Sequence, residues 1–235
     1  MVESEVSGIS AGTELLIYRG EAPEGMSADP NLPALEGTLT FPLRYGYSCV
    51  GRVVELGPDV ERQWQDRRVF AFVPHASHFV ASVADLQLVP EDMEPERAAF
   101  LPLVETAVSL VMDGRPLIGE HACVLGQGIL GLVTTALLSR LALGRLVTAD
   151  IYARRRALSV DLGADLSLDP TLADFLPHAT AALVDKTGGQ SGADVTFEVS
   201  GNPAALDQAI ALTGDHGRVI IGSWYGTRRA DVRIA

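Results

Sequence analysis

The sequence predicts an α/β protein in which a β-rich first part precedes a doubly wound parallel sheet. Up to about residue 90, short apolar runs alternate with turns containing Gly and Pro, a pattern typical of strands. From Pro95 onward, apolar runs of strand length alternate with segments of helical period, a pattern typical of a parallel sheet covered by helices. We therefore expect two domains, residues 1–90 and residues 91–235.

The elements follow from these patterns in order. In the first part we expect strands at residues 51–56, 68–73 and 78–83 and a loop at residues 20–40, which are rich in Gly, Pro, Ala and acids. A proline-led helix should run from Pro95 through Val111. In the second part we expect strands at residues 122–125, 146–149, near 166, 194–199 and 218–221, with helices after residue 131, at 154–162 and from about 203.

The most informative motif follows the first strand of the second part. Residues 123–131 read Cys-Val-Leu-Gly-Gln-Gly-Ile-Leu-Gly, and Asp150 lies nineteen positions later at the end of the next apolar run. In a dinucleotide site, Gly126 would form the sharp turn, Gly128 would let the pyrophosphate approach the backbone, and Gly131 would let the helix pack closely. The predicted site therefore consists of Gly126, Gln127, Gly128, Ile129, Leu130, Gly131 and Asp150.

The same pattern predicts NAD in preference to NADP, because Asp150 can accept both ribose hydroxyls and would repel a 2'-phosphate. Arg155 either lies over the adenosine end of the cofactor or belongs to a solvated helix face with Arg154 and Arg156. Ser200 and Gly201 follow a predicted strand, where they either contact the ligand or form an ordinary turn.

Composition excludes several classes of protein. The chain has 235 residues, 47% of them apolar, and 30 acidic against 18 basic residues give a net charge of -12. Because the bases are scattered, we expect no nucleic-acid partner. Residues 128–147 are mostly apolar, but Arg140 and Arg145 argue against a membrane span. Cys49 and Cys123 lie in apolar runs, so we expect buried thiols. The N-terminal residues show no signal-peptide pattern, so we expect a cytoplasmic protein.

Beyond these patterns, the chain resembles the medium-chain dehydrogenase/reductase superfamily. The resemblance rests on the segments at residues 8–13, 45–57, 66–69 and 217–222, together with the glycine motif, Asp150 and Glu198-Val-Ser-Gly201. It implies a GroES-like β domain followed by a Rossmann domain, and an NAD(P)-dependent oxidoreductase. Because family members have further strands before Val6 and continue beyond Ile221, we expect both domains to be incomplete in this chain.

The departures from the family concern zinc. Where zinc alcohol dehydrogenases have a metal-binding Cys and a Gly-His-Glu motif, this chain has Ser10 and Gly46-Tyr47-Ser48, and the third ligand position falls near Leu101 or Pro102. These groups cannot replace thiolate and imidazole around Zn²⁺, so no metal site is expected. His75 and His78 are a poor substitute pair because residues three apart in a strand point to opposite faces.

The segments at residues 7–14, 19–20 and 45–47 most resemble a zinc-free branch of this superfamily, which includes bacteriochlorophyllide dehydrogenase-like proteins. Without zinc, the resemblance implies a cleft between the domains where Ser10, Thr13, Tyr47 or Thr106 donates a hydrogen bond to a small-molecule substrate. For each of these residues a structural hydroxyl remains the alternative. Two other interpretations stay open: a truncated, non-catalytic relative that binds a dinucleotide, and an interaction subunit or homo-oligomer that pairs through the strand at 218–221.

Overall fold

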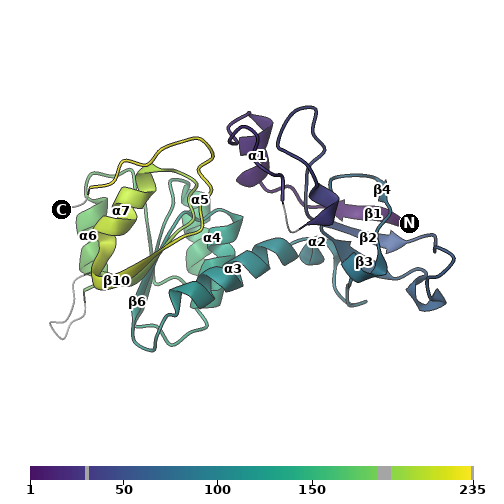
Figure 1. Ribbon diagram of the computed structural model, residues 1–235. Helices are drawn as coiled ribbons and strands as arrows, with labels where there is room; N and C mark the ends of the chain where they lie inside the picture. Colours follow the sequence, from purple (N-terminus) through teal and green to yellow (C-terminus); the bar gives the residue numbers. More distant parts are fainter. Residues whose placement is uncertain (30–31, 185–191, 234–235) are drawn as a thin grey trace. The chain divides into compact units, whose positions relative to one another are not determined.

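The computed structural model describes residues 1–29, 32–184 and 192–233. The chain divides into two compact units, Met1–Pro102 and Leu103–Ala235. Figure 1 shows β1, β2 and β3 in the first unit and the sheet strands with their helices in the second. Within these described ranges, every helix is too short or too polar to cross a membrane.

The first unit is built on an antiparallel sheet with the strand order β4-β1-β2-β3-β5. Its strands are β1 (Val2–Ser7), β2 (Cys49–Val53), β3 (Arg68–Ala71), β4 (His78–Phe79) and β5 (Gln87–Leu88). Cys49 lies opposite Ala71 in one buried cluster, and the next pair, Val50 and Phe70, lies in another. Successive side chains of a strand point to opposite faces, so both faces of this pair of strands are covered.

Short helical segments lie between these strands and after the last of them. They are α1 (Thr13–Tyr18), α2 (Pro95–Ala98) and the 3-10 turns η1 (Pro33–Leu35), η2 (Arg62–Trp64) and η3 (Val83–Asp85). The strand predicted at residues 78–83 ends already at Phe79. The reason is local, because the Ser82 hydroxyl accepts a hydrogen bond from the Ala84 N–H and begins η3.

The boundary between the units lies at Pro102, later than the predicted boundary at residue 90. Ala98 and Ala99, at the end of α2, are buried in one cluster with Val50, Phe70 and Val89. The proline-led segment thus contributes to the hydrophobic core of the first unit. A Pro-led helix start alone does not reveal which core the helix joins.

The single helix predicted from Pro95 through Val111 is wrong. The structure has α2 and a separate α3 (Leu101–Gly114). Pro102 accounts for the break, because proline has no N–H to continue the helical hydrogen bonds of α2 and is tolerated in the first turn of a new helix.

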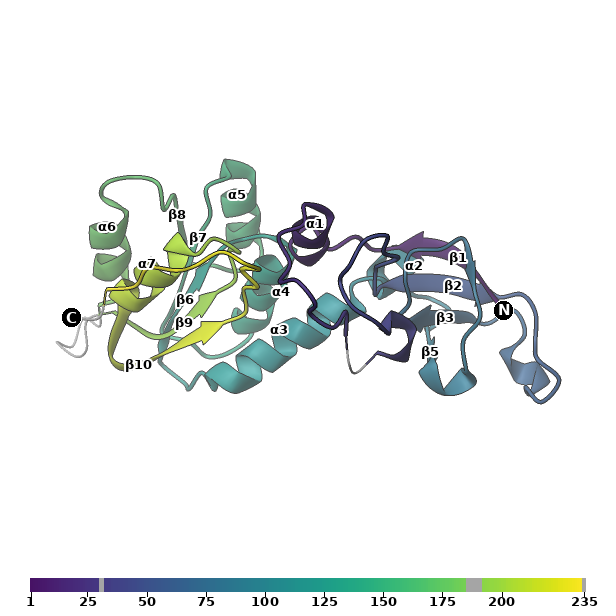
Figure 2. The same cartoon turned by 45° about the horizontal axis from the view of Figure 1, so that its top comes forward.

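The second unit contains the predicted parallel sheet, with the order β10-β9-β6-β7-β8 in its described part (Figure 2). Its strands are β6 (His121–Leu125), β7 (Arg145–Ala149), β8 (Leu166–Leu168), β9 (Ala193–Glu198) and β10 (Thr213–Ile221). The chain runs outward from β6 through β7 to β8 and then returns to the other side of β6 at β9. The carboxyl ends of β6 and β9 therefore form the point where the strand order reverses, which is where ligands bind in such sheets.

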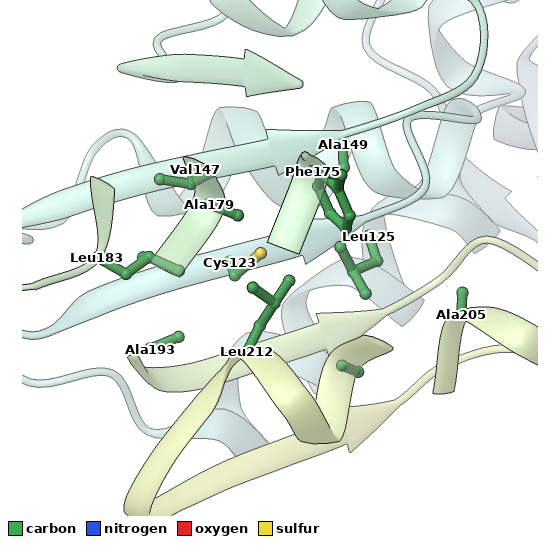
Figure 3. Packing of buried hydrophobic residues seen from close by; sticks show 11 residues of the cluster. Cys123, Leu125, Val147, Ala149, Phe175, Ala179, Leu183, Ala193, Ala205 and Leu212 are labelled. Carbon is green, nitrogen blue, oxygen red and sulfur yellow. The ribbon is translucent and has the colours of Figure 1, made fainter. Parts of the chain in front are cut away.

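Helices cover both faces of this sheet. They are α3, α4 (Ile129–Leu138), α5 (Ala153–Asp161), α6 (Phe175–Ala182) and α7 (Ala204–Leu212). Cys123 and Leu125 of β6 pack with residues of α6 and α7, as Figure 3 shows, whereas Ala122 and Val124 pack with residues of α3 and α4. The alternation confirms the predicted fold class, because a strand buried on both faces requires helices on each.

Cys49 and Cys123 are buried free thiols, as predicted. Burial raises the pKa of the Cys123 thiol to about 12 and also raises the pKa of Cys49. A buried, protonated thiol is a poor nucleophile, so neither cysteine is a candidate for chemistry.

Candidate functional site

The glycine turn begins at Gly126, directly after β6. Its backbone has a φ of +95°, which favours glycine, and a Cβ built on it would lie 2.6 Å from Ser200 N at the end of β9. The turn is thus tightly packed against the neighbouring strand end. The structure brings Gly126 and Ser200 together at the point where the strand order reverses.

Gly128 precedes α4 and has space around it. A Cβ built on this residue would meet nothing within 4 Å, so the glycine is not required by packing inside the chain. The first N–H groups of a helix have no partner within the helix, and Ile129 and Leu130 are the first two residues of α4. An anionic group could approach the backbone here, where the helix dipole favours negative charge.

Gly131 has a different role. A Cβ at this position would overlap the carbonyl oxygen of Gly126, lie 2.9 Å from its carbonyl carbon and lie 3.3 Å from Val199 Cγ2. The first turn of α4 therefore lies directly against the glycine turn and β9. This is the close packing that the motif predicts for its third glycine.

Gln127 holds the turn from inside. Its side chain is fully buried, with Oε1 accepting a hydrogen bond from the Thr135 hydroxyl at 3.0 Å and Nε2 donating to Gly126 O at 3.1 Å. Its backbone N–H donates to Asp150 Oδ2 at 2.7 Å. Gln127 stays a predicted cofactor-site residue, and within the chain these contacts orient the turn and Asp150.

Asp150 lies directly after β7 and is 6% exposed. Its Oδ2 accepts from Gln127 N, and its Oδ1 accepts from Tyr152 N at 2.8 Å. Arg155 Nη1 lies 3.5 Å from Oδ2, and its guanidinium carbon lies 4.7 Å from the centroid of the Tyr152 ring. Each carboxylate oxygen can accept a second hydrogen bond, so the group is oriented and still able to bind a diol.

The end of β9 carries a buried carboxylate that the sequence patterns did not identify as functional. Glu198 is fully buried, and its Oε1 accepts from Ser200 N at 2.8 Å and from the Ser200 hydroxyl at 2.5 Å. Its Oε2 accepts from the Tyr225 hydroxyl. Burial, followed by this hydrogen bond, raises the pKa of Tyr225 above its ordinary value. Gly201, at a φ of +71°, donates its N–H to the Ser223 hydroxyl at 2.8 Å. The network fixes the loop beside the glycine turn.

The predicted hydrogen-bond donors lie in both units. Ser10 and Thr13 lie at the start of α1, and Tyr47 lies before β2 with its ring 6.1 Å from that of Tyr45. Thr106 is exposed on α3 in the second unit. Ser10 is joined through its backbone N–H to Glu14 Oε1 at 2.7 Å.

Sequence reasoning missed one constellation in the first unit. His75 Nδ1 is hydrogen-bonded to the Ser7 hydroxyl, and its Nε2 lies 2.7 Å from Glu14 Oε2. His75 is separated from these partners by 68 and 61 residues, so no local pattern could have joined them. His78 has other partners, Ser77 and Glu3.

The donor set at the family's zinc position does not fit the metal. Ser10 offers a hydroxyl and Tyr47 a phenol, where Zn²⁺ needs thiolate or imidazole. Among the residues that the structure describes, no three His, Cys, Asp or Glu side chains are grouped to hold a metal ion.

The chain is similar in sequence and in fold to known dehydrogenases. Residues 130–233 match the model of the zinc-binding dehydrogenase family. The chain is 27% identical over 211 residues to the (R,R)-butanediol dehydrogenase of Bacillus subtilis (strain 168), covering 78% of this chain and 59% of the relative. The chain thus spans less than two thirds of that relative's length.

Two solved structures share the fold. A proposed zinc-binding dehydrogenase from Sinorhizobium meliloti 1021, bound to NADP, superposes with a TM-score of 0.74 at 21% identity, covering 99% of this chain and 71% of the other. A protein of Escherichia coli CFT073, described as a short chain alcohol dehydrogenase and complexed with NADH, gives a TM-score of 0.72 at 16% identity, covering 99% and 70%. The chain is thus similar in sequence and fold to zinc-type alcohol dehydrogenase-like proteins of the medium-chain dehydrogenase/reductase superfamily.

Proposed function

We propose that this chain is the cofactor-binding and substrate-binding part of a nicotinamide-dinucleotide-dependent oxidoreductase that acts on a small alcohol or carbonyl compound. The observation that carries the proposal is the pairing of an open Gly128 with an oriented Asp150. A chain that used these residues only for packing would have no need for glycine at a position with nothing within 4 Å.

The residues around the turn suit a dinucleotide. The N–H groups of Ile129 and Leu130 would bind the pyrophosphate, and Asp150 would accept the hydroxyls of the adenosine ribose. Ser200 and Gly201 would border the pyrophosphate and nicotinamide side, next to Gly126. When bound, the cofactor supplies hydride exchange, while the chain's own residues bind it, orient it and exchange the substrate proton.

We further propose NAD rather than NADP as the cofactor. Asp150 has its carboxylate fixed by two backbone N–H groups, and a 2'-phosphate beside it would meet like charge. Arg155 lies against the same carboxylate and would cover the adenosine end. The fold itself does not decide the question, because one neighbour was solved with NADP and another with NADH.

Zinc independence is also part of the proposal. It is supported by the chemistry of Ser10 and Tyr47, which replace the ligands that Zn²⁺ prefers. A hydrogen-bond donor must then polarise the substrate oxygen, and Ser10, Thr13, Tyr47 and Thr106 remain the proposed candidates. The substrate would be a small molecule. We also propose a cytoplasmic location, which the two free thiols support. We propose no nucleic-acid partner and no membrane partner.

A second candidate function is supported by the position of β10. This strand lies at one end of the described sheet, so its outer edge offers N–H and C=O groups to another strand. A homo-oligomer, or a non-catalytic interaction subunit, could pair there. Light scattering of the purified chain would test this: a monomer at all concentrations contradicts pairing.

The test of the main proposal is calorimetric titration with NADH and NADPH, followed by a panel of secondary alcohols and their ketones. We expect stoichiometric NADH binding and oxidation or reduction of at least one compound in the panel. Binding without turnover on a broad panel would support the non-catalytic relative. Absence of binding would contradict the proposal.

A further inference from the structure

The carboxylate of Glu198 is buried at the end of β9, beside the glycine turn. In the described part of the chain, its hydrogen-bond partners are three donors: Ser200 N, the Ser200 hydroxyl and the Tyr225 hydroxyl. The Ser200 hydroxyl accepts from Asn202 N at 3.0 Å, which leaves its own proton to donate to Glu198. Surroundings made of donors are those of an ionised carboxylate, which can only accept hydrogen bonds.

This buried charge has no cationic partner among the residues that the structure describes. Their ion pairs, with nitrogen and oxygen within 4.0 Å, all involve other carboxylates. Arg228 is exposed to solvent and donates to the backbone carbonyl of Tyr225. Burial, followed by the hydrogen bond to Glu198, raises the pKa of Tyr225, so the phenol keeps its proton and remains a donor. The charge of Glu198 is thus held by hydrogen bonds and is not neutralised.

The order of the strands puts this charge on the nicotinamide side of the proposed site. Asp150, which would bind the adenosine ribose, follows β7, and β7 and β9 lie on opposite sides of β6 (Figure 2). The pyrophosphate would bind between them, at the turn that joins β6 to α4. A dinucleotide that continues in the same direction brings its nicotinamide half to the carboxyl end of β9, where Glu198 lies.

The glycine turn and the end of β9 are in close contact. A Cβ built on Gly126 would lie 2.6 Å from Ser200 N, and the same N–H donates to Glu198 at 2.8 Å. One backbone amide therefore separates the carboxylate from the turn. A buried charge is screened by salt and water less than a charge on the surface, so its effect reaches the neighbouring ligand site.

We propose that Glu198 stabilises the oxidised form of the bound dinucleotide and thereby favours reduction of a carbonyl substrate. The inference rests on the proposed oxidoreductase function. The oxidised nicotinamide ring carries a positive charge and the reduced ring is neutral, so a carboxylate without a cation attracts the oxidised form alone. The phosphate charges are the same in both forms and cancel when the two are compared.

This preference sets the direction that the reaction favours on the protein. In the reduction of a carbonyl compound, the carbonyl carbon takes a hydride from the reduced ring, and the carbonyl oxygen takes a proton to become a hydroxyl. The ring gains a positive charge in this step and loses it in the reverse step. The charge of Glu198 therefore shifts the equilibrium between the bound reactants toward the alcohol and the oxidised dinucleotide.

The same network holds the loop at Ser200 and Gly201, so an electrostatic role must be separated from a structural one. Loss of a contact that orients the loop would weaken binding of both forms of the dinucleotide by the same factor. Loss of the charge would weaken binding of the oxidised form alone. The ratio of the two dissociation constants distinguishes these cases.

Three substitutions make this comparison. Glu198→Gln removes the charge and fits the same network, because the amide oxygen can accept from Ser200 and the amide nitrogen can donate to the Tyr225 oxygen. Tyr225→Phe removes one hydrogen bond and keeps the charge. Asp194→Asn removes a charge from the same face of β9 four residues earlier, where Asp194 Oδ2 accepts from His121 N at 2.7 Å.

The test is calorimetric titration of the full chain and of each variant with NAD⁺ and with NADH. We expect the ratio of the NAD⁺ to the NADH dissociation constant to rise about tenfold in Glu198→Gln and to stay parental in Tyr225→Phe and Asp194→Asn. A tenfold change is about 1.4 kcal/mol, which two unit charges about 12 Å apart give at an effective dielectric constant of about 20. A parental ratio in Glu198→Gln, or an equal rise in Asp194→Asn, would overturn the proposal.

Glu198→Met is the second neutral variant, and urea unfolding of each variant identifies those that are folded. A folded Glu198→Met should raise the ratio by a similar factor, and a parental ratio there would also overturn the proposal. A parent chain that binds neither form of the dinucleotide refutes the proposed function. Binding of both forms with a ratio that no neutral variant changes refutes this inference alone.

The direction of the reaction is tested with the chain in excess over the dinucleotide and a fixed ratio of alcohol to ketone from the panel. The absorbance of the reduced ring then reports which form is bound at equilibrium. We expect the ratio of reduced to oxidised dinucleotide to be about tenfold higher in Glu198→Gln than in the parent. Equal ratios would contradict the proposed direction.

Discussion

Adding one methyl group at Gly128 and at Gly131 should separate cofactor binding from stability. At Gly128 the added carbon enters open space, so the free energy of unfolding should change by less than about 1 kcal/mol, the size of an unfavourable helix cap. The same carbon occupies the place where the pyrophosphate would approach. Gly128→Ala should therefore weaken NADH binding at least about tenfold, or roughly 1.4 kcal/mol.

At Gly131 the methyl group meets backbone. It would overlap Gly126 O and lie 2.9 Å from the carbonyl carbon, where unstrained carbon atoms are about 3.5–4.0 Å apart. Overpacking typically costs about 1–3 kcal/mol, and contact with backbone places this site at the upper end. Alanine in a helix returns at most about 1 kcal/mol, so the net loss should be about 2 kcal/mol.

Urea unfolding and NADH titration of the two variants measure both quantities. We expect Gly131→Ala to lose stability and binding together, and Gly128→Ala to lose binding alone. Gly128→Val should abolish binding with the fold intact. If Gly128→Val bound NADH like the parent, or if Gly131→Ala were as stable as the parent, the reasoning about the turn would be refuted.

Four further predictions concern cofactor specificity, metal content, the hydrogen bond between Tyr225 and Glu198, and the dependence of stability on pH. Asp150→Ser should narrow the preference for NADH over NADPH, and tighter NADPH binding by the parent in calorimetry would contradict it. Metal analysis of the purified chain should find no stoichiometric zinc; a chelator-resistant zinc would mean that the donor set has been misjudged. Tyr225→Phe should cost about 1–3 kcal/mol in urea unfolding by leaving Glu198 one donor short. Stability should also fall as pH rises above about 10, where the unfolded chain releases phenol protons that the folded chain keeps because the pKa values of Tyr225 and Tyr45 are raised. Phe at either position should flatten that slope, and an unchanged slope would contradict the assignment.

The parts of the fold that the sequence could predict are those with local signals. The glycine turn and Asp150 lie within 25 residues, and each glycine has a distinct steric reason that the motif expresses directly. The parallel sheet follows from the alternation of apolar runs. The break between α2 and α3 could also have been predicted, because Pro102 is a local signal for the start of a new helix. The apolar period that continues across the break hid this signal.

The contacts that could not be predicted are those between distant segments. The Tyr225 hydroxyl reaches Glu198 across 27 residues, and Ser7 and Glu14 reach His75 across 68 and 61. Hydroxyl, imidazole and carboxyl side chains occur throughout any sequence, so only the paired strands and the space that Gly46 leaves for the His75 ring bring these particular groups together. The inward turn of Gln127 is a similar case, because its position in the motif fixes the backbone and not the side chain.

The most direct test of the central claim is a calorimetric titration of the unmodified chain with NADH. We expect saturable binding of one NADH per chain, tighter than the binding of NADPH. A titration in which neither dinucleotide binds would contradict it, because an open Gly128 at a helix start and an oriented Asp150 would then serve no ligand of this class.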